Sequence, residues 1–122
     1  MTDAITGWMN GYLKAWESND PEDIRAIFTE DATYRTQPYG APWRGHQEII
    51  DGWTEAGDTP GNHRFEWHVL AIAGDLAFVQ GETIYPDSSD YSNLWVIRLA
   101  ADGRASDFTE WWVEHPPAVG RS

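Results

Sequence analysis

The spacing of apolar residues changes once along this chain of 122 residues, and the change separates a helical part from a strand part. Up to about residue 56, apolar side chains recur every three or four positions, which is typical of amphipathic helices. After Gly61 they alternate with polar ones, and β-branched and aromatic residues become frequent, which is typical of strands. Helices followed by an antiparallel meander indicate an α+β domain.

Three helices are expected in the first part. One spans residues 3–17 and presents a single apolar face, formed by Ile5, Trp8, Met9, Tyr12, Leu13 and Trp16. The next begins at Asp20-Pro21-Glu22-Asp23, where a capping Asp precedes a proline and two acids, all favoured at a helix start. After a short extended segment at residues 32–36, the third helix is expected at about residues 45–56.

Four strands are expected in the second part, at residues 62–73, 75–85, 90–100 and 104–114. Gly and Asp form short turns between the first two and between the last two, and a longer polar loop at residues 86–89 joins the middle pair. We therefore expect a single domain over residues 1–115. A tail rich in Pro and Gly, residues 116–122, is expected to be flexible.

Alternation divides the side chains of these strands between two faces. One expected face is almost wholly apolar and contains Phe65, Trp67, Val69, Ala77, Val79, Leu94, Val96, Trp111 and Val113. The other mixes aromatic and polar groups, namely Glu66, His68, Phe78, Gln80, Glu82, Asn93, Trp95, Ile97, Phe108, Glu110 and Trp112. The helices can shield only one face of the sheet from water, and neither face is polar enough to be exposed. We therefore expect a homodimer through the apolar face. In the alternative, the helices cover the apolar face and the mixed face is exposed to solvent.

Composition restricts the kinds of partner. Eight Trp, five Tyr and four Phe are a heavy load for this length, so the core or a pocket must be aromatic. The net charge of −12 argues against nucleic acids and anionic membranes as partners. With no Cys, disulfides, thiol nucleophiles and thiolate metal sites are excluded. Because no leader pattern and no bilayer-length apolar run is present, we expect a cytoplasmic protein.

Several segments resemble those of nuclear transport factor 2-like proteins, in the same order. The opening of that superfamily is similar to Tyr12-Leu13-Lys14-Ala15-Trp16, Asn19-Asp20-Pro21-Glu22-Asp23-Ile24 and Phe28-Thr29-Glu30-Asp31-Ala32-Thr33-Tyr34. Its third helix and its last hairpin are similar to Trp43-Arg44-Gly45-His46-Gln47-Glu48-Ile49-Ile50 and to Ile97-Arg98-Leu99 with Asp102-Gly103-Arg104. The resemblance, to the SnoaL-like and ketosteroid isomerase-like branch, covers about residues 5–115. It implies a cone-shaped, curved antiparallel sheet with three N-terminal helices on its concave face, enclosing a pocket lined by the mixed face.

The resemblance to ketosteroid isomerases implies that only part of their catalytic site is present in this sequence. Tyr12 falls where that family keeps its oxyanion-hole tyrosine. The general base of the family falls near Thr36, and its protonated Asp near Trp95, so neither position holds a carboxyl group. Steroid isomerisation by that arrangement is not expected, and the Asp-Arg-Asp constellation of limonene epoxide hydrolases cannot be assembled either.

The expected catalytic residues of the pocket are Glu110, Glu82, His68 and Tyr12. A carboxylate among aromatic rings is desolvated, which suits it to act as a general base, and a neighbouring His can exchange the proton. SnoaL-like cyclases are thought to abstract a proton next to a carbonyl with such a pair. The expected ligand-binding side chains are Trp16, Tyr34, Trp53, Gln80, Asn93, Trp95, Phe108 and Trp112.

Each candidate has a structural alternative. The two acids can lie in water at the mouth of the cone or pair with one of the arginines Arg35, Arg64 and Arg98. His68 can be a structural histidine and Tyr12 a core residue. The Trp side chains can be packing rather than ligand platforms.

Two functions stay open on this basis. The first is a cofactor-independent isomerase, cyclase or lyase, which performs acid–base chemistry on a small apolar carbonyl or polyketide-like compound. The second is a non-catalytic module that binds a small hydrophobic ligand or dimerises. No metal is expected, because His46 and His63 lack partners at ligand spacing, and no phosphate loop, nucleophile elbow or dinucleotide motif supports a cofactor.

Overall fold

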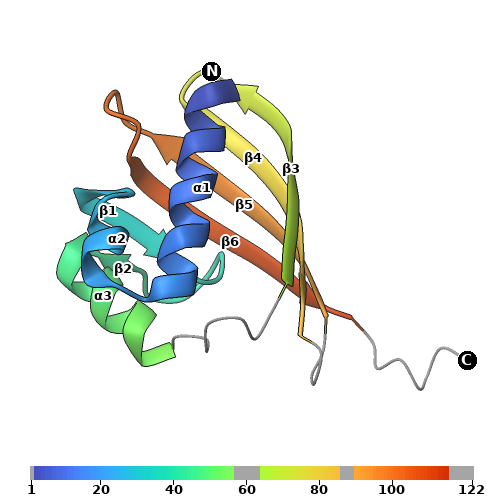
Figure 1. Ribbon diagram of the computed structural model, residues 1–122, viewed down its shortest axis with the longest axis horizontal. Coiled ribbons are helices and arrows are strands. Elements are labelled where there is room, and N and C mark those ends of the chain that lie inside the picture. Colours follow the sequence, from blue (N-terminus) through green and yellow to red (C-terminus); the bar gives the residue numbers. More distant parts are fainter. Residues whose placement is uncertain (1, 57–63, 86–89, 116–122) are drawn as a thin grey trace, which may run out of the picture.

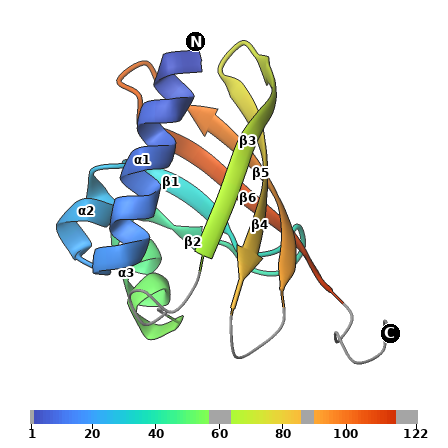
Figure 2. The ribbon, with the colours of Figure 1, turned by 45° about the vertical axis from the view of Figure 1, so that its right-hand side comes forward.

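Six strands form one curved sheet, with the helices gathered on its concave side (Figures 1 and 2). The computed structural model describes residues 2–56, 64–85 and 90–115. The helices are α1 (Thr2–Ser18), α2 (Pro21–Arg25) and α3 (Gly45–Ala56), and the strands are β1 (Phe28–Arg35), β2 (Trp43–Arg44), β3 (Arg64–Ala73), β4 (Leu76–Ile84), β5 (Tyr91–Leu99) and β6 (Ala105–Glu114). The predicted α+β class is confirmed. The expected loop at residues 86–89 and tail at 116–122 lie outside the described residues.

The strand order is β2-β1-β6-β5-β4-β3. Strands β3 to β6 pair with their neighbours in antiparallel fashion, as the predicted meander requires. Strand β1, however, is longer than the expected segment and pairs in parallel with β6, so the expectation of a wholly antiparallel sheet is wrong at this pair. Parallel neighbours need a long crossover, and here α3 and four strands intervene between β1 and β6, so no local turn signal marks the pairing.

The helices begin and pack as their sequences indicate. Asp20 caps α2, accepting a hydrogen bond of 2.9 Å from the Glu22 backbone N–H, and Pro21 occupies the first turn. The apolar stripe of α1 is buried against the concave face of the sheet through Ile5, Trp8, Met9 and Tyr12. None of the helices described is long and apolar enough to cross a membrane.

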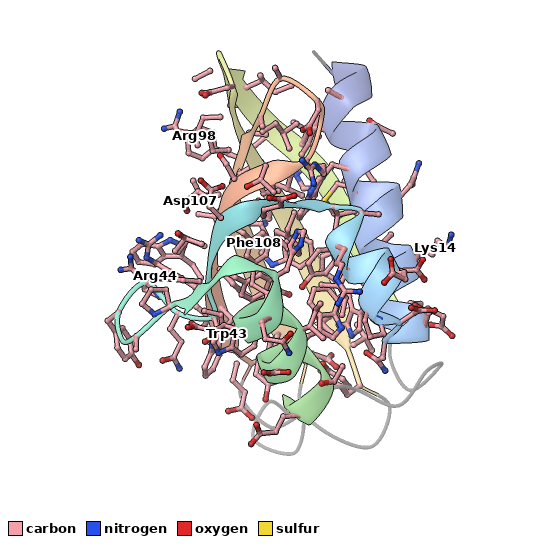
Figure 3. All side chains as sticks on the ribbon, turned by 90° about the vertical axis from the view of Figure 1, so that its left-hand side faces the viewer. Lys14, Trp43, Arg44, Arg98, Asp107 and Phe108 are labelled. Carbon is pink, nitrogen blue, oxygen red and sulfur yellow. The ribbon has the colours of Figure 1, made fainter. Side chains whose placement is uncertain are left out.

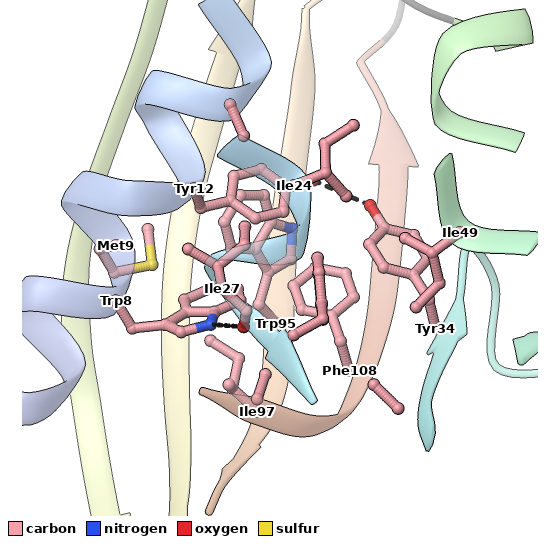
Figure 4. Close-up of a cluster of buried hydrophobic side chains, with 14 of the residues drawn as sticks. Trp8, Met9, Tyr12, Ile24, Ile27, Tyr34, Ile49, Trp95, Ile97 and Phe108 are labelled. Atoms are coloured by element: carbon pink, nitrogen blue, oxygen red, sulfur yellow. Dashed lines mark hydrogen bonds between the residues drawn. The ribbon is translucent and has the colours of Figure 1, made fainter. Parts of the chain in front are cut away.

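The core between α1 and the sheet is rich in aromatic side chains (Figure 4). The rings of Trp8 and Phe108 lie 5.8 Å apart, and those of Trp8 and Phe28 meet edge to face at 6.0 Å. The Trp8 indole Nε1–H donates a hydrogen bond of 2.8 Å to the Ile27 carbonyl oxygen, which satisfies its one polar group inside the core. The heavy aromatic load of the sequence is thus absorbed partly by packing.

The register of the strands fixes which side chains share the concave face. Trp95 lies opposite Val79 on β4 and opposite Glu110 on β6, and opposed residues of an antiparallel pair point to the same face. The concave face therefore carries Phe65, Trp67, Val69, Ala77, Val79, Asn93, Trp95, Ile97, Phe108, Glu110 and Trp112. The convex face carries Glu66, His68, Phe78, Gln80, Glu82, Leu94, Val96, Trp111 and Val113.

The predicted faces are right for β5 and β6 and wrong for β3 and β4. Gln80 pairs with Leu94, and His68 pairs with Gln80, so both polar side chains lie exposed on the convex face together with Glu82. Strands β5 and β6 carry apolar side chains on both faces, so their alternation alone does not distinguish inward from outward. The prediction therefore combined the correct faces of β5 and β6 with the wrong faces of β3 and β4.

The convex face is consequently less apolar than expected. Its apolar side chains gather on β5 and β6, whereas β3 and β4 present mainly polar ones there, Glu66, His68, Gln80 and Glu82. Arg98 and Asp107 also point away from the helices (Figure 3). The residues expected to form the homodimer face are divided between the two faces of the sheet: those on β3 and β4 lie on the concave face, and those on β5 and β6 lie on the convex face.

Candidate functional site

An open cavity of about 340 Å³ lies between the helices and the concave face, near the ends of β4, β5 and β6. Its size is at the lower end of the range of small-molecule pockets, about 300–1,000 Å³. Most of its wall is aromatic, and the lining residues are Tyr12, Trp16, Tyr34, Thr36, Trp43, Trp53, Thr83, Tyr85, Tyr91, Asn93, Trp95, Glu110 and Trp112.

Glu110 brings a carboxyl group to this aromatic wall. The side-chain Nδ2 of Asn93, on the neighbouring strand, donates a hydrogen bond of 2.6 Å to Glu110 Oε2. Thr83, one strand further, donates its hydroxyl to Asn93 Oδ1 at 2.8 Å. Because Thr83 and Asn93 are both buried, they form a line of hydrogen bonds that holds the carboxyl group in a defined orientation.

Two tyrosine hydroxyls face each other in the same cavity. Tyr12, on α1, and Tyr34, on β1, have their hydroxyl oxygens 2.8 Å apart (Figure 4). Burial raises the pKa of Tyr34 far above its usual value, the Glu110 carboxylate raises it further, and the hydrogen bond to Tyr12 opposes both. Tyr34 therefore keeps its proton at any physiological pH, and the site has a neutral hydroxyl pair within the electrostatic reach of Glu110.

The sequence as a whole matches a known family. Residues 9–115 match the family described as SnoaL-like domain. The chain belongs to this family. Among proteins with curated functions, none matches the chain in sequence.

Several solved structures resemble this SnoaL-like domain in fold. A proposed ketosteroid isomerase from Kribbella flavida superimposes with a TM-score of 0.70 at 20% identity, covering 94% of this chain and 83% of its own. A nuclear transport factor 2-like protein of unknown function from Mesorhizobium loti has a TM-score of 0.70 at 19% identity, with 91% and 92% coverage. A steroid delta-isomerase from Pseudomonas aeruginosa has a TM-score of 0.65 at 17% identity, with 96% and 82% coverage. At these identities the likeness concerns the fold.

The cavity of this SnoaL-like domain brings together most of the residues predicted for the pocket. Those that line it are Tyr12, Trp16, Tyr34, Trp53, Asn93, Trp95, Glu110 and Trp112. Phe108 is fully buried behind the wall, where its ring stacks on that of Tyr34 at 4.6 Å. It belongs to the core and does not line the cavity.

Three predicted residues lie elsewhere. Glu82, Gln80 and His68 are exposed on the convex face, on the far side of the sheet from the cavity. The prediction that they share a face with Glu110 is wrong, because the inward side chains of β4 are Ala77, Val79 and Thr83. Glu110 is thus the one carboxyl group among the lining residues that the structure describes.

Sequence reasoning missed several lining residues. Trp43 stacks its ring on that of Tyr34 at 5.0 Å and closes the wall next to α3. Thr83 lies on the same face of β4 as Ala77 and Val79, but the sequence of β4 does not show which of its two faces is turned inward. Tyr85 and Tyr91 flank the expected loop at residues 86–89, where local patterns give no direction to a side chain.

The described residues of the SnoaL-like domain include no group of three or more His, Asp or Glu side chains that could hold a metal ion. The polar groups of the cavity are instead one carboxyl group, one amide, hydroxyls and indole N–H groups. This set can bind a neutral molecule with a polar tip, accept a proton from it and donate hydrogen bonds to it.

Proposed function

We propose that this SnoaL-like domain binds a small, flat, largely apolar carbonyl compound and transfers a proton on it without a cofactor, with Glu110 as the general base. The observation that carries the proposal is the placement of a single oriented carboxyl group in an aromatic cavity beside two hydroxyls. The ketosteroid isomerase-like fold neighbours agree with a reaction of this class.

The aromatic wall supports the choice of a flat ligand. Tyr12, Trp53 and Trp95 form a contiguous group, with ring centroids 5.0 Å apart for Tyr12 and Trp53 and 4.5 Å for Tyr12 and Trp95. Such a wall gains most from covering the faces and edges of an apolar ring. Its lining residues, within the described part of the chain, include no Lys or Arg that could bind a phosphate or a carboxylate.

The polar groups support proton transfer next to a carbonyl. In the proposed step, Glu110 removes a proton from the carbon adjacent to the carbonyl, and the electron pair of that C–H bond moves onto the carbonyl oxygen. A hydroxyl of the Tyr12–Tyr34 pair stabilises the resulting enolate by donating a hydrogen bond. Return of the proton from Glu110 to another carbon completes an isomerisation, and return to the same carbon after Glu110 has traded its proton for one from solvent completes an exchange.

A deuterium-exchange experiment tests the role of Glu110. We expect the wild-type protein to accelerate exchange of the α-hydrogens of 2-tetralone in D₂O, measured by proton NMR, and Glu110→Gln to lower the accelerated rate by about 100-fold or more. Glu82→Gln is the matched control, because Glu82 is exposed on the convex face and should leave the rate unchanged.

Three results would separate the alternatives. Undiminished exchange in Glu110→Gln would exclude Glu110 as the base. Loss of exchange in Glu82→Gln would assign the chemistry to the convex face. Binding of 2-tetralone without acceleration of its exchange would favour the second candidate, a non-catalytic binding module, which the aromatic wall alone can support.

A further inference from the structure

Three aromatic side chains lie together in the outer part of the cavity, at the ends of three neighbouring strands. Tyr85 directly follows β4, Tyr91 begins β5 and Trp112 lies near the end of β6, and all three line the cavity. The ring of Tyr91 lies 5.9 Å from that of Tyr85 with the planes at 90°, and 5.8 Å from that of Trp112 with the planes at 73°. These three side chains, called the mouth rings below, therefore form walls that face in different directions.

The mouth rings are more accessible to water than the deeper wall of the cavity. Trp112 has 43% of its surface exposed, whereas Trp53 and Trp95 have 7% and 1%. Tyr85 and Tyr91 are half-buried. Contiguous aromatic surface that a protein leaves accessible in a concave site commonly marks a place where a ligand binds. The faces of these rings are thus not all used for packing within the core.

The charges around the mouth rings favour a cation. The face of an aromatic ring is the negative part of its quadrupole. Glu110 precedes Trp112 by two positions on β6, so the two side chains point to the same face from Cα atoms about 7 Å apart. The described lining residues include no Lys or Arg, and the whole chain has a net charge of −12. Each of these features attracts a positive group and repels a negative one.

We propose that the mouth rings, together with the Glu110 carboxylate, bind an alkylated ammonium group, so that the ligand of this cavity is a small carbonyl compound with a cationic head. A quaternary ammonium group can contact several ring walls at once through its alkyl groups. It has no N–H groups, so it loses no hydrogen bond to water on entering an aromatic site. The inference rests on the proposed function in that both place a carbonyl compound in this cavity, and it adds the charge that the compound carries.

The position of Glu110 also restricts where the ammonium group is attached. The carboxyl group that removes the proton lies beside Trp112 on the same strand face, so the cationic head and the carbon that loses the proton must be near each other. A nearby positive charge also stabilises the negative charge that develops when the proton leaves. A ketone with its ammonium group on the carbon next to the carbonyl meets both conditions.

Two ketones of the same shape test the proposal by binding. The probes are (2-oxopropyl)trimethylammonium and 4,4-dimethylpentan-2-one, which differ only in that a positively charged nitrogen replaces a neutral carbon. Dissociation constants for both are measured by NMR titration. The measured quantity is the ratio of the two affinities, because a loss of packing in a variant affects both probes and cancels.

Two adjacent tryptophans provide a matched pair of variants. Trp112→Leu removes a mouth ring, and Trp111→Leu makes the same change at a residue that is 50% exposed on the convex face. Both variants keep the net charge, so general attraction of the cation to the acidic protein is the same in all three proteins. We expect the wild-type protein and Trp111→Leu to prefer the ammonium ketone by about tenfold, and Trp112→Leu to lose about fivefold of that preference.

Three results would overturn the proposal. One is equal binding of the two probes by the wild-type protein, which would show that the mouth rings select only apolar shape. Another is an undiminished preference in Trp112→Leu. The last is a failure of the ammonium ketone to bind the wild-type protein at several millimolar.

A spectroscopic measurement on the wild-type protein keeps the proposal testable if Trp112→Leu does not fold. The N-methyl proton signal of the ammonium ketone should move upfield on binding, because protons held over ring faces are shielded by the ring currents. Binding without upfield movement of this signal would place the ammonium group away from the rings and overturn the proposal.

The deuterium-exchange experiment separates this inference from the proposed function. Accelerated exchange of 2-tetralone together with equal binding of the two ketone probes would refute the cationic head and leave the role of Glu110 as the base standing. A preference for the ammonium ketone that is lost in Trp112→Leu, without accelerated exchange of either this ketone or 2-tetralone, would refute the catalytic proposal and leave the role of the mouth rings standing.

Discussion

The side-chain amide of Asn93 connects Thr83 to Glu110 in the cavity wall. An ionised carboxylate only accepts hydrogen bonds, so Asn93 must present its NH₂ group to Glu110, which leaves Oδ1 for the Thr83 hydroxyl. Each of the three side chains thus fixes the orientation of the next. The position of Glu110 depends on two residues that have no acid–base chemistry of their own.

Replacement of Asn93 should therefore reduce the proposed activity without removing the base. We expect Asn93→Leu, which keeps the approximate volume, to lower kcat for 2-tetralone exchange by about 10- to 100-fold through misplacement of the carboxyl group. The pH of half-maximal exchange should also rise, because loss of a donor favours the protonated carboxyl group. Thr109→Val, on β6 but on the convex face, is the control. An unchanged pH profile in Asn93→Leu would contradict the positioning role.

The buried hydroxyl of Tyr34 predicts a dependence of stability on alkaline pH. Its pKa is raised in the folded protein, so above pH 10 the unfolded chain loses this proton while the folded protein keeps it, and the free energy of unfolding falls. Between pH 9 and 11 we expect the wild-type protein to lose about 1.4 kcal/mol more than Tyr34→Phe. Urea unfolding of both proteins at the two pH values measures this, and equal losses would show that Tyr34 makes no such contribution.

At the level of whole elements, the helices were easier to predict than the faces of the strands. The apolar stripe of α1 and the cap of α2 are local patterns, and both appear in the structure as expected. The inward direction of β4 depends on its register with β5, which no residue within β4 specifies. For that reason Thr83 was missed and Glu82 was placed on the wrong face.

Two glycines test what packing adds to helix propensity. Gly7 on α1 has open space where a Cβ would be, whereas a Cβ at Gly52 on α3 would overlap the ring of Trp43. We expect Gly7→Ala to stabilise the protein by about 0.5–1 kcal/mol, from helix propensity alone. Gly52→Ala should instead destabilise it by about 1–3 kcal/mol, because the clash with a cavity-wall ring exceeds that gain. Thermal or urea unfolding measures both, and stabilisation by Gly52→Ala would show that Trp43 moves away freely.

For the molecule as a whole, the convex face is the surface on which large apolar side chains are exposed on neighbouring strands. Trp111 and Val113 on β6 are 50% and 65% exposed, and they continue the apolar side chains Leu94 and Val96 of β5. An isologous contact with a second copy would bury these groups. The net charge of −12 on each copy opposes such association, and salt would weaken the repulsion.

We therefore expect a homodimer through the β5–β6 part of the convex face. Trp111→Glu should shift the mass measured by light scattering at about 100 μM from dimer to monomer, because it adds repulsion and removes apolar area. Tyr39→Glu, at an exposed aromatic residue outside this face, should leave the mass unchanged. A monomeric wild-type protein at this concentration, in high salt as well as in low, would contradict the expectation.

The order of helices and strands, the cap at Asp20 and the aromatic character of the interior follow from the amino-acid sequence, because each depends on neighbours within about one turn or one strand. The parallel pairing of β1 with β6, the inward face of β4 and the line from Thr83 to Glu110 depend on contacts between segments far apart in the chain. Such contacts depend on register and on the balance of burial over the whole sheet, which no local pattern contains. The lack of an acceptor for the Trp95 indole N–H within the described part of the chain belongs to the same class, since a missing partner is visible only when the neighbouring segments are in place.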